Sequence, residues 1–369
     1  MTHSGSVCRW GILGTAGIAR KNWRAAGQTG NAVVTAVSSR TLESAQRFID
    51  ECSLDVRFDR PVTALAPYEA LLERDDVDAI YVPLPTAMRK DWVIRAAEAG
   101  KHVLAEKPAA SNASEVREML AACEQHGVQY MDGVMFMHSS RLPLIRSLLN
   151  DPNKVGRVRR LASQFSFCGD EAFRTQNIRT DSRLEPHGCL GDLGWYCIRF
   201  FLWAMQGQMP TAVRARTLST LQGVTSPDPV PGEFSAELVF PGGVTASFYN
   251  SFVTENQQWV NISGEKGYLT IDDFVLPFHG AESAVEVHNH SFFVQNTNFH
   301  MRRHSQRSAA REFSSGLVDA QEVQLIREFS RIVVSGKLDP QWPTWTLNTQ
   351  LVLDACWESA KRNGAEVTL

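Results

Sequence analysis

The chain lacks the features that mark membrane, secreted and nucleic-acid-binding proteins. No apolar run approaches the roughly 20 residues that a transmembrane helix needs, and the opening residues, Met1–Ser6, have no apolar signal-peptide core. Net charge is only −3, with both signs mixed along 369 residues, so nothing indicates nucleic acid or an anionic membrane as a partner. Apolar and charged fractions of 43% and 21% are typical of a soluble globular protein, and the length suits two domains.

Cysteine is present but without a metal or disulfide pattern. The seven cysteines are odd in number, scattered, and never in Cys-x-x-Cys spacing. Disulfide frameworks and zinc sites both need more regular spacing. We therefore expect buried thiols in a reducing compartment, and a cytoplasmic protein. The cysteines are Cys8, Cys52, Cys123, Cys168, Cys189, Cys197 and Cys356.

The most informative feature lies at the start, where a short apolar strand runs into a turn of small residues and then a helix. Such a turn lets the helix direct its free N–H groups at a pyrophosphate. The fingerprint reads Gly14-x-Ala16-x-x-Ala19, so alanines replace its second and third glycines, and Ala16 is a departure where the pyrophosphate approaches. The alternative is a strand–helix joint that binds nothing. The expected cofactor contacts here are Gly14, Thr15, Ala16, Ile18 and Ala19.

Strand and helix patterns alternate along the first 138 residues. Repeated strand–helix units with short joints predict a doubly wound parallel sheet, so we expect an α/β Rossmann domain over residues 1–138. The expected strands are Ala32–Ser38, Val77–Leu84, His102–Ala105 and Val128–Val134, and the expected helices are Leu42–Glu51, Asp91–Ala99 and Ser111–Gln125.

The pattern changes past about Leu142, and residues 139–369 are expected to form an α+β domain with a large, mainly antiparallel open sheet. Strand runs are joined by hairpin turns such as Pro241-Gly242-Gly243. Thr225–Pro231 and Asn296–Ser315 are expected to be mobile loops. The strands are expected at Val155–Phe167, Val213–Leu221, Glu233–Phe240, Thr245–Phe252, Trp259–Ser263 and Tyr268–Ile271, and the helices near Leu190–Met205, Ala320–Val334 and Leu347–Arg362.

The end of the second expected strand indicates the cofactor. A site that prefers NAD places an acid there to bond the ribose hydroxyls, and a carboxylate repels a 2′-phosphate. Here Ser39 and Arg40 follow the strand, with no acid before Glu43. A planar, permanent guanidinium suits a phosphate. NADP(H) is therefore expected, with NAD(H) possible, although Arg40 as an ordinary solvated helix residue is the alternative.

Several motifs occur together in the order typical of one family. The chain resembles the glucose–fructose oxidoreductase / inositol dehydrogenase (Gfo/Idh/MocA) family, and is most similar to the branch with dimeric dihydrodiol dehydrogenases and NADP-dependent xylose dehydrogenases. The resemblance covers essentially the whole chain. It rests on Gly11-Ile12-Leu13-Gly14-Thr15-Ala16, Ser39-Arg40, Tyr81-Val82-Pro83-Leu84-Pro85, Glu106-Lys107-Pro108 and Gly191-Asp192-x-Gly194-x-Tyr196.

The resemblance implies hydride transfer between NADP and a hydroxyl or carbonyl of a sugar, polyol or dihydrodiol. It implies cofactor contacts at Pro83, Leu84, Thr86, Glu106 and Lys107, and a cis peptide bond between Lys107 and Pro108. Relatives often carry histidine four residues after the last proline of the Val-Pro-Leu-Pro strand end, where this chain has Arg89. If that histidine holds substrate, Arg89 changes polarity and reach.

The expected catalytic group is Lys107 with Tyr196, supported by Asp192. Oxidising an alcohol needs a base for the hydroxyl proton, and reduction needs the same group as an acid. Tyrosine is a poor base near neutrality, but a nearby ammonium favours its phenolate. Asp192 and Tyr196 are four residues apart on a predicted helix and so share a face. The alternative is Tyr196 as a core aromatic and Asp192 as a helix cap.

Other polar residues give weaker indications. Arg179 is a substrate contact by resemblance or an ordinary surface cation, and His187, just before the catalytic helix, is a further substrate candidate. The pair His300 and His304 has helical metal-ligand spacing, but neighbouring arginines would repel a dication. No metal is expected there, or at the surface pair formed by His288 and His290.

Two further expectations concern assembly and alternative activities. Phe248, Phe252 and Trp259 are expected to leave apolar area on the uncovered face of the second sheet, which predicts a homodimer or larger homo-oligomer. Neither nucleic acid nor membrane is expected as a partner. The alternatives to a dehydrogenase are a redox-neutral sugar lyase or glycosidase with a tightly bound cofactor, and a non-catalytic NAD(P)-binding sensor.

Overall fold

The chain forms two compact units in the computed structural model, which describes residues 7–369. The first unit holds the residues up to His138 together with Arg183–Pro186 and Ser315–Leu351. These two later segments were expected in the second domain. The second unit consists of Ser139–Ser182, His187–Ser314 and Val352–Leu369.

The first unit is built on a six-stranded parallel sheet with the strand order β3-β2-β1-β4-β5-β6, which confirms the doubly wound Rossmann fold. Its strands are β1 (Cys8–Leu13), β2 (Ala32–Ser38), β3 (Thr63–Leu65), β4 (Ala79–Val82), β5 (His102–Ala105) and β6 (Tyr130–Asp132). Its helices are α1 (Gly17–Gln28), α2 (Leu42–Ser53), α3 (Glu69–Leu72), α4 (Thr86–Glu98), α5 (Ala113–Gln125), the 3₁₀ turn Met135–His138 and α9 (Gln321–Ser335).

Helix α9 completes the core of the first unit although it comes from the last part of the chain. The Trp10 ring of β1 lies 5.1 Å from the Phe329 ring, and its indole N–H donates to the Ser330 hydroxyl at 3.0 Å. Such an aromatic pair adds about 0.5–1.5 kcal/mol beyond the burial of its area. The covered β1 strand therefore reads as a nearly continuous apolar run, as a parallel strand with helices on both faces must.

The second unit is built on a nine-stranded, mainly antiparallel sheet with the order β16-β13-β12-β11-β7-β10-β9-β8-β17, as expected; only β7 and β10 pair in parallel. Its strands are β7 (Val158–Cys168), β8 (Ala212–Leu221), β9 (Val230–Val239), β10 (Thr245–Ser251), β11 (Val253–Gly264), β12 (Tyr268–Ile271), β13 (Glu282–His288), β16 (Ser305–Arg311) and β17 (Val367–Thr368). Its helical segments are α6 (Arg141–Asn150), α7 (Glu171–Gln176), the 3₁₀ turns Ile178–Thr180 and Pro241–Gly243, the π-helical turn Leu190–Gly194 and α8 (Trp195–Ala204).

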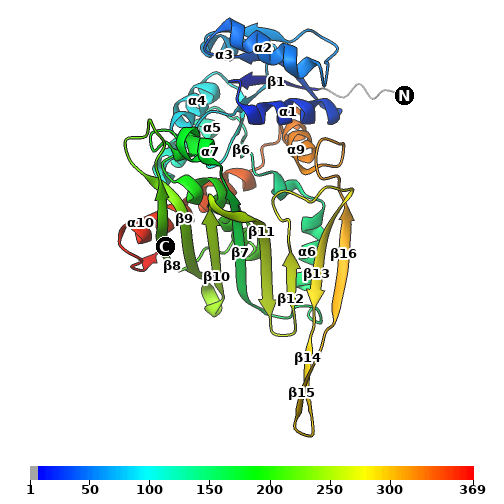
Figure 1. The fold of residues 1–369 in the computed structure, drawn as a ribbon. Helices are drawn as coiled ribbons and strands as arrows, with labels where there is room; N and C mark the ends of the chain where they lie inside the picture. The colour runs from blue at the N-terminus through cyan, green and yellow to red at the C-terminus, as the bar shows by residue number, and fades with distance from the viewer. Residues whose placement is uncertain (1–6) are drawn as a thin grey trace, which may run out of the picture. The chain divides into compact units, whose positions relative to one another are not determined.

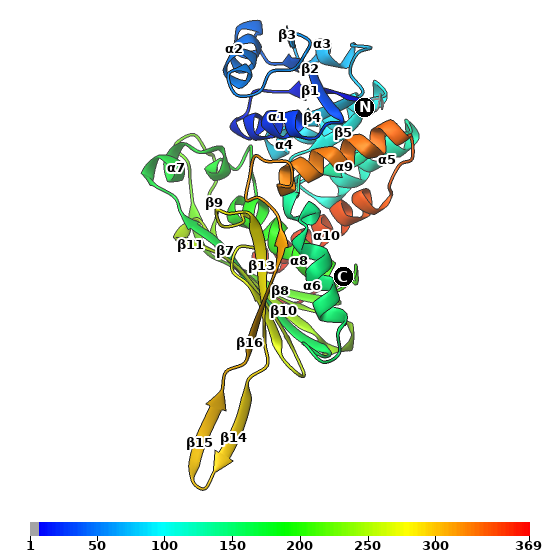
Figure 2. The same ribbon diagram turned by 90° about the vertical axis from the view of Figure 1, so that its right-hand side faces the viewer.

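One face of this sheet is covered by α6 and α8 (Figure 2). Phe248 lies 6.5 Å from Phe201 of α8, ring to ring, and is only 3% exposed, while Phe252 is fully buried. Both were expected on the uncovered face, and that expectation is wrong. Alternation along β10 turns Phe248 inward and Ser247 and Tyr249 outward, so the uncovered face is largely polar.

The segment 296–315, expected to be a loop, instead contains regular strands. Strand β16 pairs with β13 over seven residues, and β14 (Ser291–Gln295) and β15 (Asn298–Arg302) form a two-stranded hairpin. Figures 1 and 2 show this hairpin continuing β13 and β16 away from the rest of the sheet. Both faces of the hairpin are largely exposed, and its large apolar residues Phe292, Val294, Phe299 and Met301 do not cover a core.

The last helix, α10 (Gln341–Lys361), begins earlier than expected because Pro343 lies in its first turn, where proline is tolerated. Its residues up to Leu351 belong to the first unit and those from Val352 to the second. Within residues 7–369 no helix is both long and apolar enough to cross a bilayer. All seven cysteines are free thiols, and six are buried as expected, whereas Cys168 is exposed.

Candidate functional site

The first candidate site lies at the carboxyl ends of β1 and β4 in the first unit. The strand order reverses there. Strands β2 and β3 lie on one side of β1, whereas β4, β5 and β6 lie on its other side. Ligands of doubly wound sheets bind at such a switch point. All twelve residues predicted to contact a cofactor lie in this unit, in the segments that follow β1, β2, β4 and β5.

The β1–α1 turn needs glycine at one position. Gly14 has a φ of +111°, which residues with a side chain rarely adopt, and a Cβ there would lie 3.2 Å from Leu84 Cδ2. Its N–H donates to the Ser38 carbonyl at 2.9 Å, which ties the turn to the end of β2. The fingerprint turn is thus held between the ends of β2 and β4.

The N-terminus of α1 is open to an anion. Its N-cap residue, Ala16, provides no side-chain cap, and the first turn contains no acidic residue. Gly17 has open space around its Cα, and Ile18 is exposed, whereas Ala19 is fully buried where the helix packs on the sheet. Backbone N–H groups and the positive end of the helix dipole therefore suit a pyrophosphate.

The end of β2 carries one exposed cation and two buried hydroxyl groups. Ser39 is buried, Arg40 is exposed, and the Ser38 hydroxyl is buried with no hydrogen-bond partner among the described residues. Burial raises the pKa of Tyr68, and the nearby positive charge of Arg40 partly offsets this rise. Tyr68 is a candidate that sequence reasoning missed: its hydroxyl lies 3.9 Å from the position of a Cβ on Gly14, so it borders the same turn.

The end of β4 leads into α4 through Pro83, Leu84 and Pro85. Thr86, the first residue of α4, is buried, and its N–H donates to the Glu185 carboxylate at 3.0 Å. The Thr86 hydroxyl donates to the other oxygen of the same carboxylate. Sequence reasoning missed Glu185, because nothing in its local pattern indicates contact with a helix almost 100 residues earlier.

The end of β5 carries Glu106 and Lys107. The Tyr81 hydroxyl donates to the Glu106 carboxylate at 2.6 Å; burial, with that carboxylate beside it, raises the pKa of Tyr81 well above its usual value. Tyr81 thus remains a neutral donor that holds Glu106. The Lys107–Pro108 peptide bond is cis, as predicted. Tyr81 was quoted in the motif but not predicted as a site residue; a single polar tip in an otherwise apolar strand is the pattern that identifies it.

The second candidate site, in the second unit, centres on the π-helical turn Leu190–Gly194. Asp192 lies in this turn, and its carboxylate accepts from the Arg179 guanidinium at 2.7 Å. Two predicted substrate residues are thereby brought together. A Cβ on Gly194 would lie 2.9 Å from the Asn250 side-chain oxygen, so glycine lets the turn approach β10 closely. Single π-helical turns occur frequently at functional sites.

Tyr196 and His187 flank this turn in the sequence, and both are buried. The Tyr196 ring lies 5.6 Å from the Phe165 ring, edge to face. His187 packs edge-on against Trp357 at 5.4 Å, and burial, reinforced by the charge of Lys361, lowers its pKa to about 4. His187 is therefore neutral at physiological pH. Lys107 belongs to the first unit, and Asp192, Tyr196, Arg179 and His187 belong to the second.

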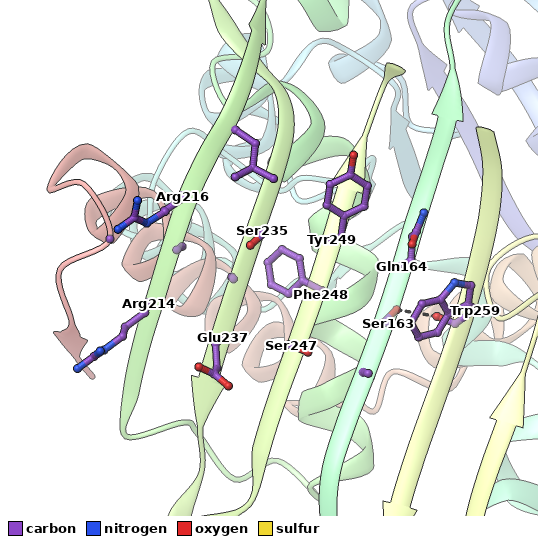
Figure 3. A pocket seen from close by; sticks show the side chains of 15 residues that line it. Ser163, Gln164, Arg214, Arg216, Ser235, Glu237, Ser247, Phe248, Tyr249 and Trp259 are labelled. Carbon is purple, nitrogen blue, oxygen red and sulfur yellow. Dashed lines mark hydrogen bonds between the residues drawn. The ribbon is translucent and has the colours of Figure 1, made fainter. Parts of the chain in front are cut away.

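A shallow hollow on the uncovered face of the second sheet contains none of the predicted site residues. It is lined by side chains from β7, β8, β9, β10 and β11, including Gln164, Arg216, Ser235, Tyr249 and Trp259 (Figure 3). Its lining combines polar and charged side chains with aromatic rings that are half-buried or buried. It contains no arrangement suited to hydride or acid–base chemistry.

The histidines of both pairs lie on strands or in the connections beside them rather than on a helix. His300 is on β15 and His304 follows it, so the two do not share a helical face. His288 is mostly buried and its ring lies 2.9 Å from the Thr270 hydroxyl, nitrogen to oxygen. No group of three or more His, Cys, Asp or Glu residues within the described part of the chain is arranged to hold a metal ion.

Comparison with protein families matches two consecutive parts of the chain. Residues 8–134 match an oxidoreductase family with an NAD-binding Rossmann fold, GFO_IDH_MocA, and residues 145–270 match the GFO/IDH/MocA C-terminal domain.

Individual relatives agree with this match. The chain is 33% identical over 267 residues to a D-xylose 1-dehydrogenase (NADP(+)) of Haloferax volcanii, covering 70% of this chain and 74% of that enzyme. It is 30% identical over 240 residues to trans-1,2-dihydrobenzene-1,2-diol dehydrogenase of Bos taurus, covering 65% and 66%. The structure of KijD10, a 3-ketoreductase from Actinomadura kijaniata in complex with NADP and TDP-benzene, superposes with a TM-score of 0.79 at 26% identity and covers 96% of this chain and 98% of that one.

Proposed function

The chain belongs to the GFO/IDH/MocA family of oxidoreductases, and on this premise we propose that it transfers hydride between NADP(H) and a hydroxyl or carbonyl group of a sugar, polyol or dihydrodiol. The relatives named above, which include an NADP-dependent sugar dehydrogenase and a dihydrodiol dehydrogenase, support this substrate class.

The observation that carries the proposal is the cofactor end of the first sheet. The open N-terminus of α1, beside a Gly14 turn that admits no side chain, suits the pyrophosphate. Ser39 and Arg40, with no acid at the end of β2, suit a 2′-phosphate rather than free ribose hydroxyls. The orphaned Ser38 hydroxyl is a further polar group at this end. Pro83, Leu84, Thr86, Glu106 and Lys107 complete the proposed cofactor contacts.

The bound nicotinamide would supply or accept the hydride. Tyr196 takes the hydroxyl proton of the substrate in oxidation and returns a proton to the carbonyl oxygen in reduction. The Lys107 ammonium favours the phenolate form of Tyr196 and stabilises negative charge that develops on the substrate oxygen. Asp192, held by Arg179, accepts a hydrogen bond from a substrate hydroxyl. Neutral His187 is proposed to contact the bound sugar.

We further propose a homodimer or higher homo-oligomer in the cytoplasm. The sheet of the second unit is covered by helices on one face, and half-buried Trp259 and Tyr249 lie on the other. These rings suit contact with a second copy of the chain. The free thiols fit a reducing compartment.

The test is a screen of aldoses, inositols, deoxy- and anhydro-sugars and dihydrodiols with NADP and with NAD, followed at the nicotinamide absorbance. A dehydrogenase gives a steady absorbance change with at least one of these substrates, and NADP supports the faster rate. Substrate consumption without net change in absorbance would instead indicate a redox-neutral reaction. Tight NADPH binding without turnover of any substrate would favour a sensor.

A further inference from the structure

Arg89 is one of the few buried arginines in the chain. It lies on the first turn of α4 and is 4% exposed. A guanidinium that is taken out of water must be compensated by hydrogen bonds or an opposite charge. Its partners therefore indicate what this residue does.

The guanidinium of Arg89 reaches from α4 to the segment that follows β5. One nitrogen, Nη1, donates to the Pro108 carbonyl and also to the Thr86 hydroxyl oxygen at 3.1 Å. The other, Nη2, lies 4.0 Å from a carboxylate oxygen of Glu185. Arg89 thus joins three segments of the first unit, and its planar fork, rather than charge alone, makes these contacts possible.

Glu185 belongs to a four-residue strap, Arg183–Pro186, that packs with the first unit although the residues on either side of it belong to the second. The strap covers the start of α4. Leu184 accepts from the Ala87 N–H at 3.2 Å, and the Glu185 carboxylate accepts from the Thr86 N–H at 3.0 Å. These are backbone donors that a helix N-terminus would otherwise leave unpaired. The strap is followed directly in the sequence by His187 and, five residues later, by Asp192.

Glu106 and Pro108, the residues on either side of Lys107, each accept a hydrogen bond from a buried side chain. On one side, Tyr81 donates to Glu106 at 2.6 Å, and on the other side Arg89 donates to the Pro108 carbonyl. Arg89 and Tyr81 are also close enough for the arginine charge to act on the phenol. Glu106 is thereby held through its side chain and Pro108 through its backbone carbonyl, one on each side of Lys107.

We propose that Arg89 and Glu185 are positioning residues for Lys107, with Arg89 anchoring the Pro108 carbonyl and Glu185 anchoring Arg89 and the start of α4. Neither residue touches the reacting atoms in this role. This proposal rests on the proposed function in one respect: the orientation of Lys107 matters for turnover only if Lys107 is catalytic. The anchoring itself is independent of any substrate.

The experiment compares Arg89→Met, Arg89→Lys and Glu185→Gln with the parent chain. Two measurements are made on each: steady-state kcat and KM with the best substrate of the screen, and the acylation rate of Lys107 by acetic anhydride. The acylation rate is read by mass spectrometry relative to exposed Lys337, and it needs neither cofactor nor turnover. Thermal unfolding and NADPH binding are measured in parallel. Lys90→Met is the matched control, because Lys90 is the next residue on α4 and pairs with exposed Glu118.

We expect Arg89→Met to lower kcat about 100-fold and to change the Lys107 acylation rate at least threefold, with NADPH affinity within about threefold of the parent. Arg89→Lys should recover little, because an ammonium cannot reach both acceptors. Glu185→Gln should lie between the parent and Arg89→Met. Lys90→Met should leave every quantity unchanged.

An unchanged Lys107 acylation rate in folded Arg89→Met or Glu185→Gln protein would overturn the proposal. So would a fall in kcat that only tracks the loss of folded protein. If Arg89→Met does not fold, Glu185→Gln and Arg89→Lys carry the test. A parent chain inactive with every substrate would contradict the proposed function, yet the acylation measurement would still decide the anchoring.

Discussion

The two units present their candidate residues in different ways. In the first unit, every predicted cofactor residue follows a parallel strand, and the strands all end at one edge of the sheet. In the second unit, neighbouring strands mostly run in opposite directions, so the turns that join them go to both ends of the sheet. The candidate residues there lie instead in and beside one π-helical turn and on the segment that carries Arg179.

The topology of each sheet determines how much of its candidate site can be predicted from the sequence. Parallel topology brings residues together by chain order alone, so a turn of small residues and the neighbouring strand ends already define a site. Antiparallel topology does not, and the pairing of Arg179 with Asp192 depends on a tertiary contact. We therefore expect the first unit to govern the cofactor and the second to govern the proton and the substrate.

Substitutions that remove the proposed chemistry should have the largest effect. Lys107→Ala in the first unit and Tyr196→Phe in the second should each lower kcat by about 10²–10⁴-fold, because each removes one part of a single acid–base unit. NADPH affinity should remain nearly that of the parent in both. Stopped-flow turnover and a fluorescence titration with NADPH measure the two quantities.

Lys337→Ala and Tyr268→Phe are the matched controls, since both residues lie far from the candidate residues in the sequence and neither is proposed to bind a ligand. If Tyr196→Phe keeps most of its activity, the proton is transferred by another group. Lys107 itself would then be the next residue to test.

The pH dependence of stability tests whether His187, in the second unit, is held in its neutral form. Its pKa of about 4 in the folded chain lies below its usual 6.5, chiefly because of burial. The unfolded chain therefore binds a proton between these values that the folded chain does not, and the stability contributed by neutral His187 is lost as pH falls through this window. Between pH 7 and pH 5 the loss should be about 2 kcal/mol.

His187→Phe should remove this loss while keeping an aromatic ring against Trp357. The measurement is urea unfolding of parent and variant at pH 7, 6 and 5, and the quantity of interest is the difference in their free energies of unfolding. A difference that stays constant across these pH values would show that His187 is not held in its neutral form.

The sequence predicts the first unit better than the second for physical reasons. Its buried strands and the Gly14 turn carry their own patterns, so the sheet and the cofactor end follow from local rules. Glu185 could not be predicted, because its partner Thr86 is 99 residues away in the chain. The strands within residues 296–315 were missed because the segment is mostly polar, and the alternating Phe299 and Met301 of β15 stay exposed instead of covering a core.

Arg40 tests whether the first unit alone sets the cofactor preference. The parent should bind NADPH at least tenfold more tightly than NADH, because a guanidinium bonds a 2′-phosphate strongly. Arg40→Ala should reduce this ratio by about tenfold, with Ser39→Ala giving a smaller reduction. Arg47→Ala, an exposed arginine further along α2, is the control. Equal affinities of the parent for the two cofactors would contradict the assignment.

The smallest effect on turnover is expected from a substitution on the uncovered face of the second sheet, because the first sheet has no such face. The parallel sheet is sandwiched between helices, so a second copy of the chain has no sheet face to contact there. The second sheet offers one, on which half-buried Trp259 is held by a hydrogen bond from its indole N–H to Gln257 at 3.1 Å. Large aromatic rings of this kind dominate protein interfaces.

Light scattering at micromolar concentration should give a multiple of the 41.1 kDa chain mass, and Trp259→Glu should lower it with little change in kcat. Leu54→Glu, at an exposed leucine of the first unit, should leave the mass unchanged. A monomeric parent would count against the interface, and would leave the polar hollow beside Trp259 as an ordinary solvated surface.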